Sequence, residues 1–409
     1  MQISRKSLLA ISLLIPGGPL FAQHLTHTIE GTVVDEKNKP LAGVYVTGAG
    51  KGGQTDRNGH YVIKHVPEGK VCLKTTYFST FASEKRDISL VSDTTMNFML
   101  AEDALSYNEV VVTGTRTERR LSETPVQTLL IKDHEIRKAA STSTLETLQD
   151  NIPGIVISPN AMGNNMRIKG LNSRYILFLV DGERMVSEGA GGNLNLDQVD
   201  VNSIDRIEMI QGAASALYGS NAVGAVINII TKKPASKFEA NAQVRASSHN
   251  TWRARAEVGA KAGLFSTRVS GFRNSSDGFG GDGNGAYAAR YEDWGSNLRM
   301  AFDPSERFKA NISARYFRHE TFNQEGAMNV IHPLTHTVAI GAGTEFHSKD
   351  HRNVTRVSGN WDKYFDMEVL ELKHDNRRKN TADYGTARLT HNFEMNDRFT
   401  LIGGAEYNK

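Results

Sequence analysis

The segment from Ser203 to Pro234, SIDRIEMIQGAASALYGSNAVGAVINIITKKP, decides the fold of this chain. Isoleucine and methionine recur from 204 to 210 and a glycine then breaks the run, which predicts a strand that ends there. Residues 213 to 217 favour a short helix. Residues 223 to 230 are almost all apolar, apart from a glycine and Asn228. Such a continuous apolar strand predicts cover on both faces of its sheet.

The same segment resembles the end of the plug domain of TonB-dependent outer-membrane receptors, whose pattern is roughly I-E-x-I-x-G-x-x-S-A-L-Y-G-S-x-A-x-G-G-V-I-N-I-I-T. Gln211 stands where the family usually has arginine, and Ala225 replaces the second glycine of the usual pair. The stretches MRIKG (166–170) and YILFLVDG (175–182) resemble two further plug strands. The resemblance implies a plug domain over residues 131–234, in a receptor that closes a β-barrel around it.

Length and composition limit the classes of function. The 409 residues allow two or three domains, and the formal net charge of +3 is too small to indicate nucleic-acid binding. No phosphate-binding glycine loop and no G-x-S-x-G nucleophile turn is present, so we expect neither an enzyme nor a permanently bound cofactor. The single cysteine, Cys72, cannot form an internal disulfide. The 37 glycines and 10 prolines favour β-structure with many turns.

The amino-terminal residues have the pattern of an export signal. Arg5 and Lys6 precede an apolar run that is shorter than the roughly 20 residues needed to cross a bilayer, and prolines and glycines follow. The pattern predicts a cleaved signal peptide over residues 1–22. No later stretch is apolar for long enough to form a spanning helix, so a membrane role requires strands.

Residues 28–101 show short alternating strands separated by turn residues, including an Asn58-Gly59 pair that favours a hairpin. The stretches GTVVDEKNKPLAGVYV and TDRNGHYVI resemble the carboxypeptidase-regulatory-like, transthyretin-like domain. We therefore expect a small β-sandwich, of a kind whose members bind rather than catalyse.

Residues 102–130 are predicted to form a linker. Within it, a valine-rich hexapeptide resembles the TonB box, the segment that such receptors present to TonB of the inner-membrane TonB–ExbB–ExbD complex. An extended segment of this kind can add as a strand to another sheet by backbone hydrogen bonds. The alternative is that it forms the last strand of the preceding sandwich. The predicted contact residues are Glu109, Val110, Val111, Val112, Thr113 and Gly114.

Within the plug, a short helix is predicted at Thr144–Gln149, and the polar stretches 158–165 and 183–195 are predicted as loops. By resemblance these loops lie at the outward tip of the plug and contact the ligand; the alternative is that they are only solvated connections. The candidate ligand-binding residues are Asn160, Met162, Asn164, Asn165, Arg184, Met185 and Asn193.

Residues 235–409 alternate apolar and polar side chains, as in TWRARAEVGAK (251–261). Such alternation in segments of about ten residues is typical of transmembrane β-barrel strands, and a soluble sandwich is the alternative. Short turns, one of them at 361–366, alternate with long loops at 274–295 and 318–352. An odd number of strands cannot close a bacterial barrel, so we expect an amino-terminal fragment of the receptor. The predicted strands are nine: 237–246, 251–261, 264–273, 296–303, 307–317, 353–362, 366–374, 384–393 and 398–407.

The expected fold class is therefore mainly β: a transthyretin-like sandwich, an α+β plug and the first strands of an antiparallel barrel in outer-membrane lipid. The resemblance implies TonB-driven import of a scarce, bulky nutrient, namely a ferric siderophore, haem or cobalamin. Imidazole binds haem and metals, so His332 and His336 in the predicted long loop are candidate ligands; unspecific loop histidines are the alternative. Import of an oligosaccharide or peptide, and surface signalling, also stay open.

Overall fold

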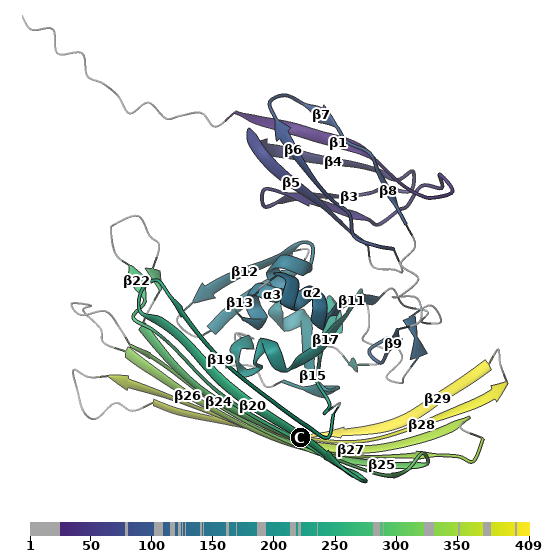
Figure 1. Ribbon diagram of the computed structural model, residues 1–409, viewed down its shortest axis with the longest axis vertical. Coiled ribbons are helices and arrows are strands. Elements are labelled where there is room, and N and C mark those ends of the chain that lie inside the picture. The colour runs from purple at the N-terminus through teal and green to yellow at the C-terminus, as the bar shows by residue number, and fades with distance from the viewer. Residues whose placement is uncertain are drawn as a thin grey trace, which may run out of the picture. The chain divides into compact units, whose positions relative to one another are not determined.

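The computed structural model forms two compact units, residues 1–76 with 83–100, and residues 77–82 with 101–409. Figure 1 shows both units, with the chain coloured from purple to yellow. The structure describes residues 25–77, 81–101, 109–114, 119–121, 124, 126, 128–139, 141, 143–160, 163–168, 170–185, 194–212, 218–219, 222–234, 236–280, 287–288, 290–322, 331–350, 352–370, 378–396 and 399–409. The predicted signal peptide and the predicted helix at 213–217 lie outside these residues.

The first unit consists of two small sheets. One sheet has the order β4-β1-β7, with β8 also paired to β1, and the other has the order β3-β2-β5-β6. Apolar side chains between the sheets are fully buried, among them Ile29, Val46 and Leu73. This agrees with the predicted all-β unit. The strands are β1 (Thr26–Asp35), β2 (Tyr45–Gly48), β3 (Lys51–Gln54), β4 (His60–Pro67), β5 (Gly69–Thr76), β6 (Lys85–Leu90), β7 (Thr94–Thr95) and β8 (Phe98–Leu100).

The second unit contains a five-stranded sheet, here called the plug sheet, with the order β11-β17-β18-β15-β16. Every residue of β15 is buried, and so are the first five residues of β18, which explains their continuous apolar sequence. The two strands run parallel to each other, whereas the other pairs are antiparallel. The strands are β11 (Thr128–Lys132), β15 (Ile176–Val180), β16 (Glu183–Arg184), β17 (Ile204–Gln211) and β18 (Ala225–Thr231).

Two short helices and a smaller sheet accompany the plug sheet. Helix α3 (Thr144–Asn151) extends the predicted helix by two residues, and the Ser143 side chain caps it by accepting a hydrogen bond from the Glu146 amide. Helix α2 (Asp133–Ala139) was not predicted, because only one of its residues, Ile136, is a buried apolar one. Strands β12 (Ile155–Asn160), β13 (Gly163–Ile168) and β14 (Leu171–Asn172) form the smaller sheet. None of the described helices is long and apolar enough to cross a membrane.

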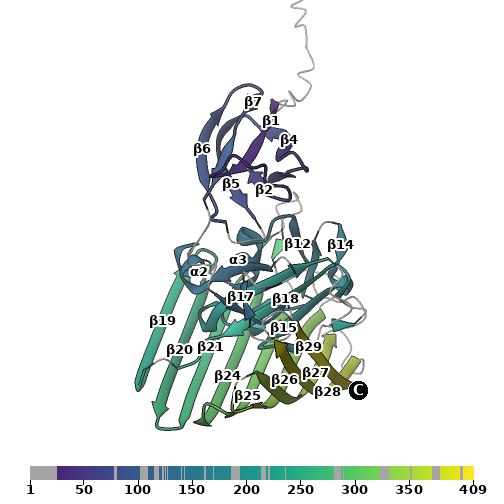
Figure 2. The same cartoon turned by 90° about the vertical axis from the view of Figure 1, so that its right-hand side faces the viewer.

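A nine-stranded antiparallel sheet, here called the wall sheet, follows in chain order and curves around the plug (Figures 1 and 2). Each strand pairs with the next one along the chain, as a meander does. The strands are β19 (Phe238–Ser247), β20 (Thr251–Ala262), β21 (Phe265–Ser276), β24 (Arg290–Ser305), β25 (Phe308–Phe322), β26 (Ile331–His347), β27 (Asn353–Leu370), β28 (Arg378–Asn396) and β29 (Phe399–Asn408). Two two-residue strands, β22 (Phe279–Gly280) and β23 (Tyr287–Ala288), pair with each other.

The predicted count of nine strands matches the wall sheet, but two of the predicted segments were wrong. Strand β26 occupies most of the predicted long loop at 318–352. Strand β27 runs without interruption through the predicted turn at 361–366, and it pairs with β26 and β28 along that stretch. One strand was therefore missed and another was divided in two, and the two errors cancel in the total.

The two faces of the wall sheet differ in chemistry. Large apolar side chains such as Trp252, Ile312 and Leu389 are exposed on the outward face, whereas Arg268, Asp293 and other polar residues between them are buried. Hydrophobic residues gather at the lower edge of the space-filling view, where Figure 1 places the wall sheet. This alternation is the pattern that the sequence predicts for strands with lipid on one side and polar surroundings on the other.

Candidate functional site

The segment Glu109–Gly114, here called the partner segment, lies against the plug. Among the described residues, its strand β9 (Val110–Val111) pairs with β10 (Arg119–Arg120) alone, in a two-residue ladder. Val111 is 1% exposed, and Glu109 forms an ion pair of 3.0 Å with Lys132 of β11. In the part of the chain that the structure describes, this segment therefore pairs with β10 and not with a strand of the sandwich, and the linker over residues 102–130 stays a prediction.

The partner segment is held mainly by one buried carboxylate of the plug sheet. Glu208 of β17 is 0% exposed. Its Oε2 accepts hydrogen bonds from the amides of Val112 and Thr113, both at 2.8 Å, and from Thr113 Oγ1 at 2.7 Å. Its Oε1 accepts one from Arg206 Nε at 2.9 Å. Hydrogen bonds to a charged acceptor are about twice as strong as neutral ones, so this carboxylate is the main anchor of the segment.

Two further side chains form hydrogen bonds with Thr113, which is itself 0% exposed. Asn228 Nδ2 donates to Thr113 Oγ1 at 3.1 Å, and the Tyr218 hydroxyl donates to the Thr113 carbonyl at 3.0 Å. The Oδ1 of Asn228 accepts from the Gly182 amide at 3.1 Å. Asn228 thus connects the partner segment to the turn that follows β15.

Ion pairs connect that turn to the wall sheet. Arg299 of β24 lies 2.8 Å from Asp181 Oδ1, and Arg388 of β28 lies 3.4 Å from Glu183 Oε1. The Ser358 hydroxyl of β27 also donates to Glu183 Oε1, at 3.0 Å. The acids come from the plug and the bases from the wall sheet, and all four charged side chains are about four-fifths buried.

A large cavity adjoins the partner segment. Its volume is about 750 Å³, and it reaches from Glu109 and Val112 past the Asp181 turn to polar side chains of β25 to β28. Arg356 and Arg388 are among the charged residues that line it. This polar space lies on the inward face of the wall sheet, so the plug does not fill the region beside the segment.

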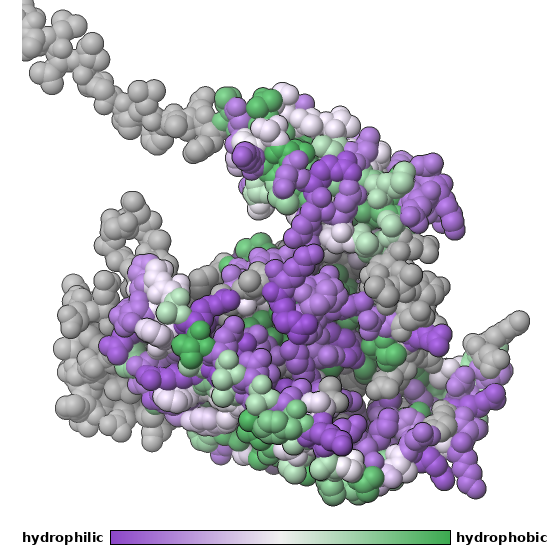
Figure 3. Space-filling view, viewed as in Figure 1, coloured by the Kyte–Doolittle hydropathy of each residue, from purple (hydrophilic) through white to green (hydrophobic). Residues whose placement is uncertain are grey.

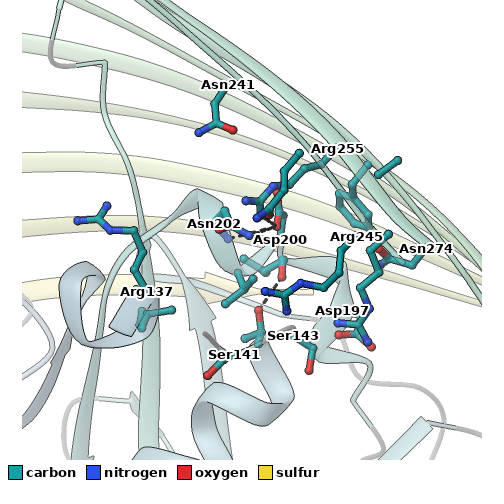
Figure 4. Close-up of a pocket in the computed structure, with 18 of the residues that line it drawn as sticks. Arg137, Ser141, Ser143, Asp197, Asp200, Asn202, Asn241, Arg245, Arg255 and Asn274 are labelled. Atoms are coloured by element: carbon teal, nitrogen blue, oxygen red, sulfur yellow. Dashed lines mark hydrogen bonds and ion pairs between the residues drawn. The ribbon is translucent and has the colours of Figure 1, made fainter. Parts of the chain in front are cut away.

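A second cavity, of about 410 Å³, lies between the plug and strands β19 to β21 (Figure 4). Arg245 and Arg255 extend from the wall sheet toward Asp197 and Asp200 of the plug, and Arg255 lies 3.0 Å from Asp200. Burial raises the pKa of Asp200, although Arg255 opposes the shift. The arrangement joins plug and wall by charge and leaves room for solvent between them.

Asp197 in this cavity keeps some solvent contact, but the surrounding protein removes most of the water near it. Burial raises the pKa of Asp197 to about 6, and the nearby Asp293 carboxylate adds to the shift, whereas Arg253 and His319 oppose it. The Asp293 carboxylate itself lies 2.6 Å from His319 Nδ1. Asp197 therefore gains a proton under mildly acidic conditions.

The predicted ligand-contact residues fall in several places. Asn160 ends β12, Asn164 and Asn165 lie on β13, and Met162 and Asn193 are outside the described residues. Arg184 of β16 stacks over the Tyr384 ring of β28, with 5.3 Å between the guanidinium carbon and the ring centroid. Met185 is only 3% exposed, so its side chain packs inside the plug. Ligand contact by these residues stays a prediction.

The histidine prediction needs a correction. His332 and His336 lie on strand β26 rather than in a long loop. The His336 ring contacts Tyr316 of β25, whose hydroxyl lies 3.0 Å from Nδ1, and Tyr316 is on the outward face with Ile312. Within the described residues, no group of three or more His, Cys, Asp or Glu side chains is placed to hold a metal ion.

Sequence reasoning missed the residues that hold the partner segment, although a signal was present. Glu208 and Asn228 are polar residues inside the apolar strands β17 and β18, and both are buried. A buried polar group needs a partner, so its position in such a strand indicates a contact with another segment. The sequence does not say which segment that is.

Comparison with known families identifies both units. Residues 120–226 match the TonB-dependent Receptor Plug Domain, and residues 29–112 match the CarboxypepD_reg-like domain. The chain carries the plug of a TonB-dependent receptor. The resemblance that the sequence showed at residues 203–234 is thereby confirmed.

Curated relatives of this receptor plug include vitamin B12 transporters. The chain is 37% identical to the vitamin B12 transporter BtuB of Vibrio vulnificus over 141 residues, which are 34% of this chain and 23% of that protein. It is 34% identical to the Vibrio cholerae transporter over 142 residues, with the same coverage. The match thus spans less than a quarter of the length of these curated relatives. These relatives are transporters by name.

Solved structures share the fold of the receptor. The pyoverdine outer-membrane receptor FpvA of Pseudomonas aeruginosa aligns with a TM-score of 0.62 and 17% identity, over 75% of this chain and 50% of that one. The siderophore receptor PirA of Acinetobacter baumannii aligns with a TM-score of 0.56 and 18% identity, over 69% and 47%. The predicted fold class is confirmed by these likenesses.

Proposed function

We propose that this chain belongs to an outer-membrane receptor that binds a bulky nutrient outside the cell and imports it with energy from TonB. In this proposal residues 1–22 direct export, 28–101 form an accessory binding domain, 102–130 carry the TonB box, 131–234 form the plug and 235–409 begin the barrel. The wall sheet, with apolar side chains outward and polar ones inward, supports a location in outer-membrane lipid.

The observation that carries the proposal is the way in which the partner segment is attached. Of the residues that the structure describes, just two members of the segment form a strand ladder, and the contacts at Thr113 come from side chains of the plug. Such a segment can leave the plug without breaking the plug sheet. Once free, its β-branched residues can pair with the edge of a partner's sheet. A pull on the segment would then act on the plug beside the 750 Å³ cavity.

The relatives support one order of preference among the proposed ligands. The plug sequence is most informative here, because the solved receptors are too distant in sequence to argue beyond the fold. The matched transporters carry vitamin B12 by name, so a corrinoid comes first among the proposed ligands, and ferric siderophores and haem follow. The position of His336 on the outward face removes the reason for preferring haem.

Uptake and binding can be separated by changing the partner segment in the complete receptor. Deletion of Glu109–Gly114 is expected to abolish uptake of the ligand while its binding to whole cells persists. Val110→Pro should act in the same way, because proline removes a backbone donor, whereas Val110→Thr keeps a β-branched strand former and should keep uptake. Uptake that survives the deletion would contradict TonB-driven import.

The ligand is found by competition on the complete receptor between cobalamin, ferric siderophores, haem and maltooligosaccharides. Cobalamin is expected to bind most tightly, and His332→Ala with His336→Ala should leave that binding unchanged. Saturable haem binding that weakens in this double variant would instead support the original histidine hypothesis. Preferred binding of an oligosaccharide would contradict the proposed ligand class.

A further inference from the structure

The contacts of Thr113 point to a device that controls when the partner segment becomes available. We propose that Glu208 and Asn228 act as a latch. The latch is the set of hydrogen bonds from these two side chains to Thr113, and it keeps the partner segment docked on the plug. This rests on the proposed function of residues 109–114 as the segment that meets TonB. The contacts that make up the latch lie within the part of the chain that the structure describes.

The chemistry of the latch is specific for one residue. Thr113 presents an amide and a hydroxyl, and both donate to the same oxygen of Glu208, while its hydroxyl oxygen accepts from Asn228. A carboxylate accepts only, and an asparagine side chain both donates and accepts, so the three groups satisfy one another. Valine in place of Thr113 would have nearly the same shape but would leave the buried Asn228 donor without its acceptor.

The geometry also explains how the latch is coupled to the rest of the receptor. Asn228 holds Thr113 with Nδ2 and the Gly182 amide with Oδ1. Gly182 lies between the two acids that bind Arg299 and Arg388 of the wall sheet. A shift of this turn therefore moves the Gly182 amide, which donates to Asn228 Oδ1, and loosens the hold of Asn228 on Thr113. Glu208 and Asn228 are positioning residues in this scheme, since they act by holding Thr113.

Docking is measured directly by alkylation of a buried position in the segment. Val111 is 1% exposed, so a Val111→Cys side chain reacts with a maleimide only when the segment has left the plug. The measurement uses the complete receptor with its other cysteines replaced, including Cys72→Ser. Thr113→Val and Glu208→Gln are each expected to raise the alkylation rate by roughly tenfold or more, because a charge-assisted or buried hydrogen bond is lost.

Two controls separate a latch from general loosening of the plug. Thr113→Ser keeps the hydroxyl and should restore a rate close to that of the parent. Thr144→Val removes another buried threonine hydroxyl of the plug, which donates to the Val199 carbonyl at 2.6 Å, and should leave the rate unchanged. An equal rise in Thr144→Val, or no rise in Thr113→Val and Glu208→Gln, overturns the latch.

The latch and the proposed function can fail independently. Alkylation is read without any partner, so a rate that depends on Glu208 supports the latch even if a TonB fragment fails to bind the receptor, which would contradict the proposed function alone. Conversely, equal capture of TonB by the parent and by Glu208→Gln would overturn the latch and leave the proposed function intact.

Discussion

The plug sheet and the wall sheet bury their side chains in different ways. In β18 the residues from Ala225 to Ile229 are all buried, whereas in β20 exposed residues such as Trp252 and Val258 alternate with less exposed ones. A polar residue in a wall strand therefore indicates little beyond the face of the wall sheet on which its side chain lies. A polar residue in a plug strand, such as Glu208, indicates a specific contact, because nothing else compensates its burial.

The difference in burial between the two sheets also indicates that the contacts between plug and wall contribute less to stability than those inside the plug sheet. Plug and wall meet through charged side chains, Asp181 with Arg299 and Asp200 with Arg255 among them, and cavities of about 750 and 410 Å³ lie along this boundary. Apolar packing dominates inside the plug sheet, and it loses much more free energy when a side chain is removed. Substitutions in the two sheets should therefore have unequal effects.

The largest effect is expected inside the plug sheet. Ile227 is fully buried in β18, so Ile227→Ala should lower the free energy of unfolding of the plug by about 2–5 kcal/mol. Val258→Ala, at an exposed position of the wall sheet, should cost less than about 1 kcal/mol. Urea titration of the receptor in detergent, followed by protease digestion of the plug, measures both. Equal losses would mean that the two sheets do not differ in burial.

The second effect tests the outward face of the wall sheet. Leu389 is 46% exposed on β28, and arginine there should destabilise folding into lipid vesicles by about 2–4 kcal/mol. The adjacent Thr390 lines the polar cavity, so Thr390→Arg should be tolerated much better. Folding yields of the two variants in vesicles give the comparison. If Thr390→Arg were the more harmful of the two, the assignment of inward and outward faces would be reversed.

A smaller effect is expected at the boundary between the sheets. Asp181 accepts hydrogen bonds from the amide and hydroxyl of Thr231 as well as from Arg299, so Asp181→Asn should cost about 1–3 kcal/mol. Asp205 pairs with the neighbouring Arg206 and is 47% exposed, and Asp205→Asn should cost almost nothing. The urea midpoint of each variant distinguishes them, and a similar midpoint shift in both would argue against fastening of the plug through Asp181.

The smallest effect is a pH dependence at Asp197. Burial raises the pKa of Asp197 from its ordinary value of 3.8 to about 6, so the folded state binds more protons than the unfolded state between these pH values. Stability therefore falls as the pH rises from about 4 to 6, by less than about 1.4 kcal/mol per pH unit from this group. Asp197→Asn should remove that slope in urea titrations at several pH values. An unchanged slope in the variant would assign the dependence to other groups.

Much of the fold could be predicted from local pattern, and the errors have physical causes. Strand β26 contains three histidines, a proline and two glycines, which hid its alternation. The stretch from Trp361 to Asp366 was predicted as a turn and contains two aspartates and a lysine, but Asp362 is fully buried and lies 3.9 Å from Arg315 on the inward face. Polar residues on that face imitate turn residues when the sequence is read alone.

The candidate site was predicted less completely. The valine-rich character of residues 109–114 was enough to select the partner segment, because it depends on six consecutive residues. Its docking on Glu208 and Asn228 could not be predicted, since the sequence contains no measure of which strand lies beneath it. His332 and His336 were selected as candidate ligands because a loop was predicted there. Both residues lie on strand β26, so the reason for selecting them no longer holds.

The sequence by itself determined the type of each element: a plug strand with continuous apolar residues, wall strands with alternating ones, and an extended segment before the plug. The tertiary structure alone decided which polar groups meet. Thr113 and Glu208 are 95 residues apart, and Glu183 and Arg388 are 205 apart. Alternation and propensity are properties of neighbouring residues, whereas such contacts depend on strand order and register, which are set only when the sheets assemble.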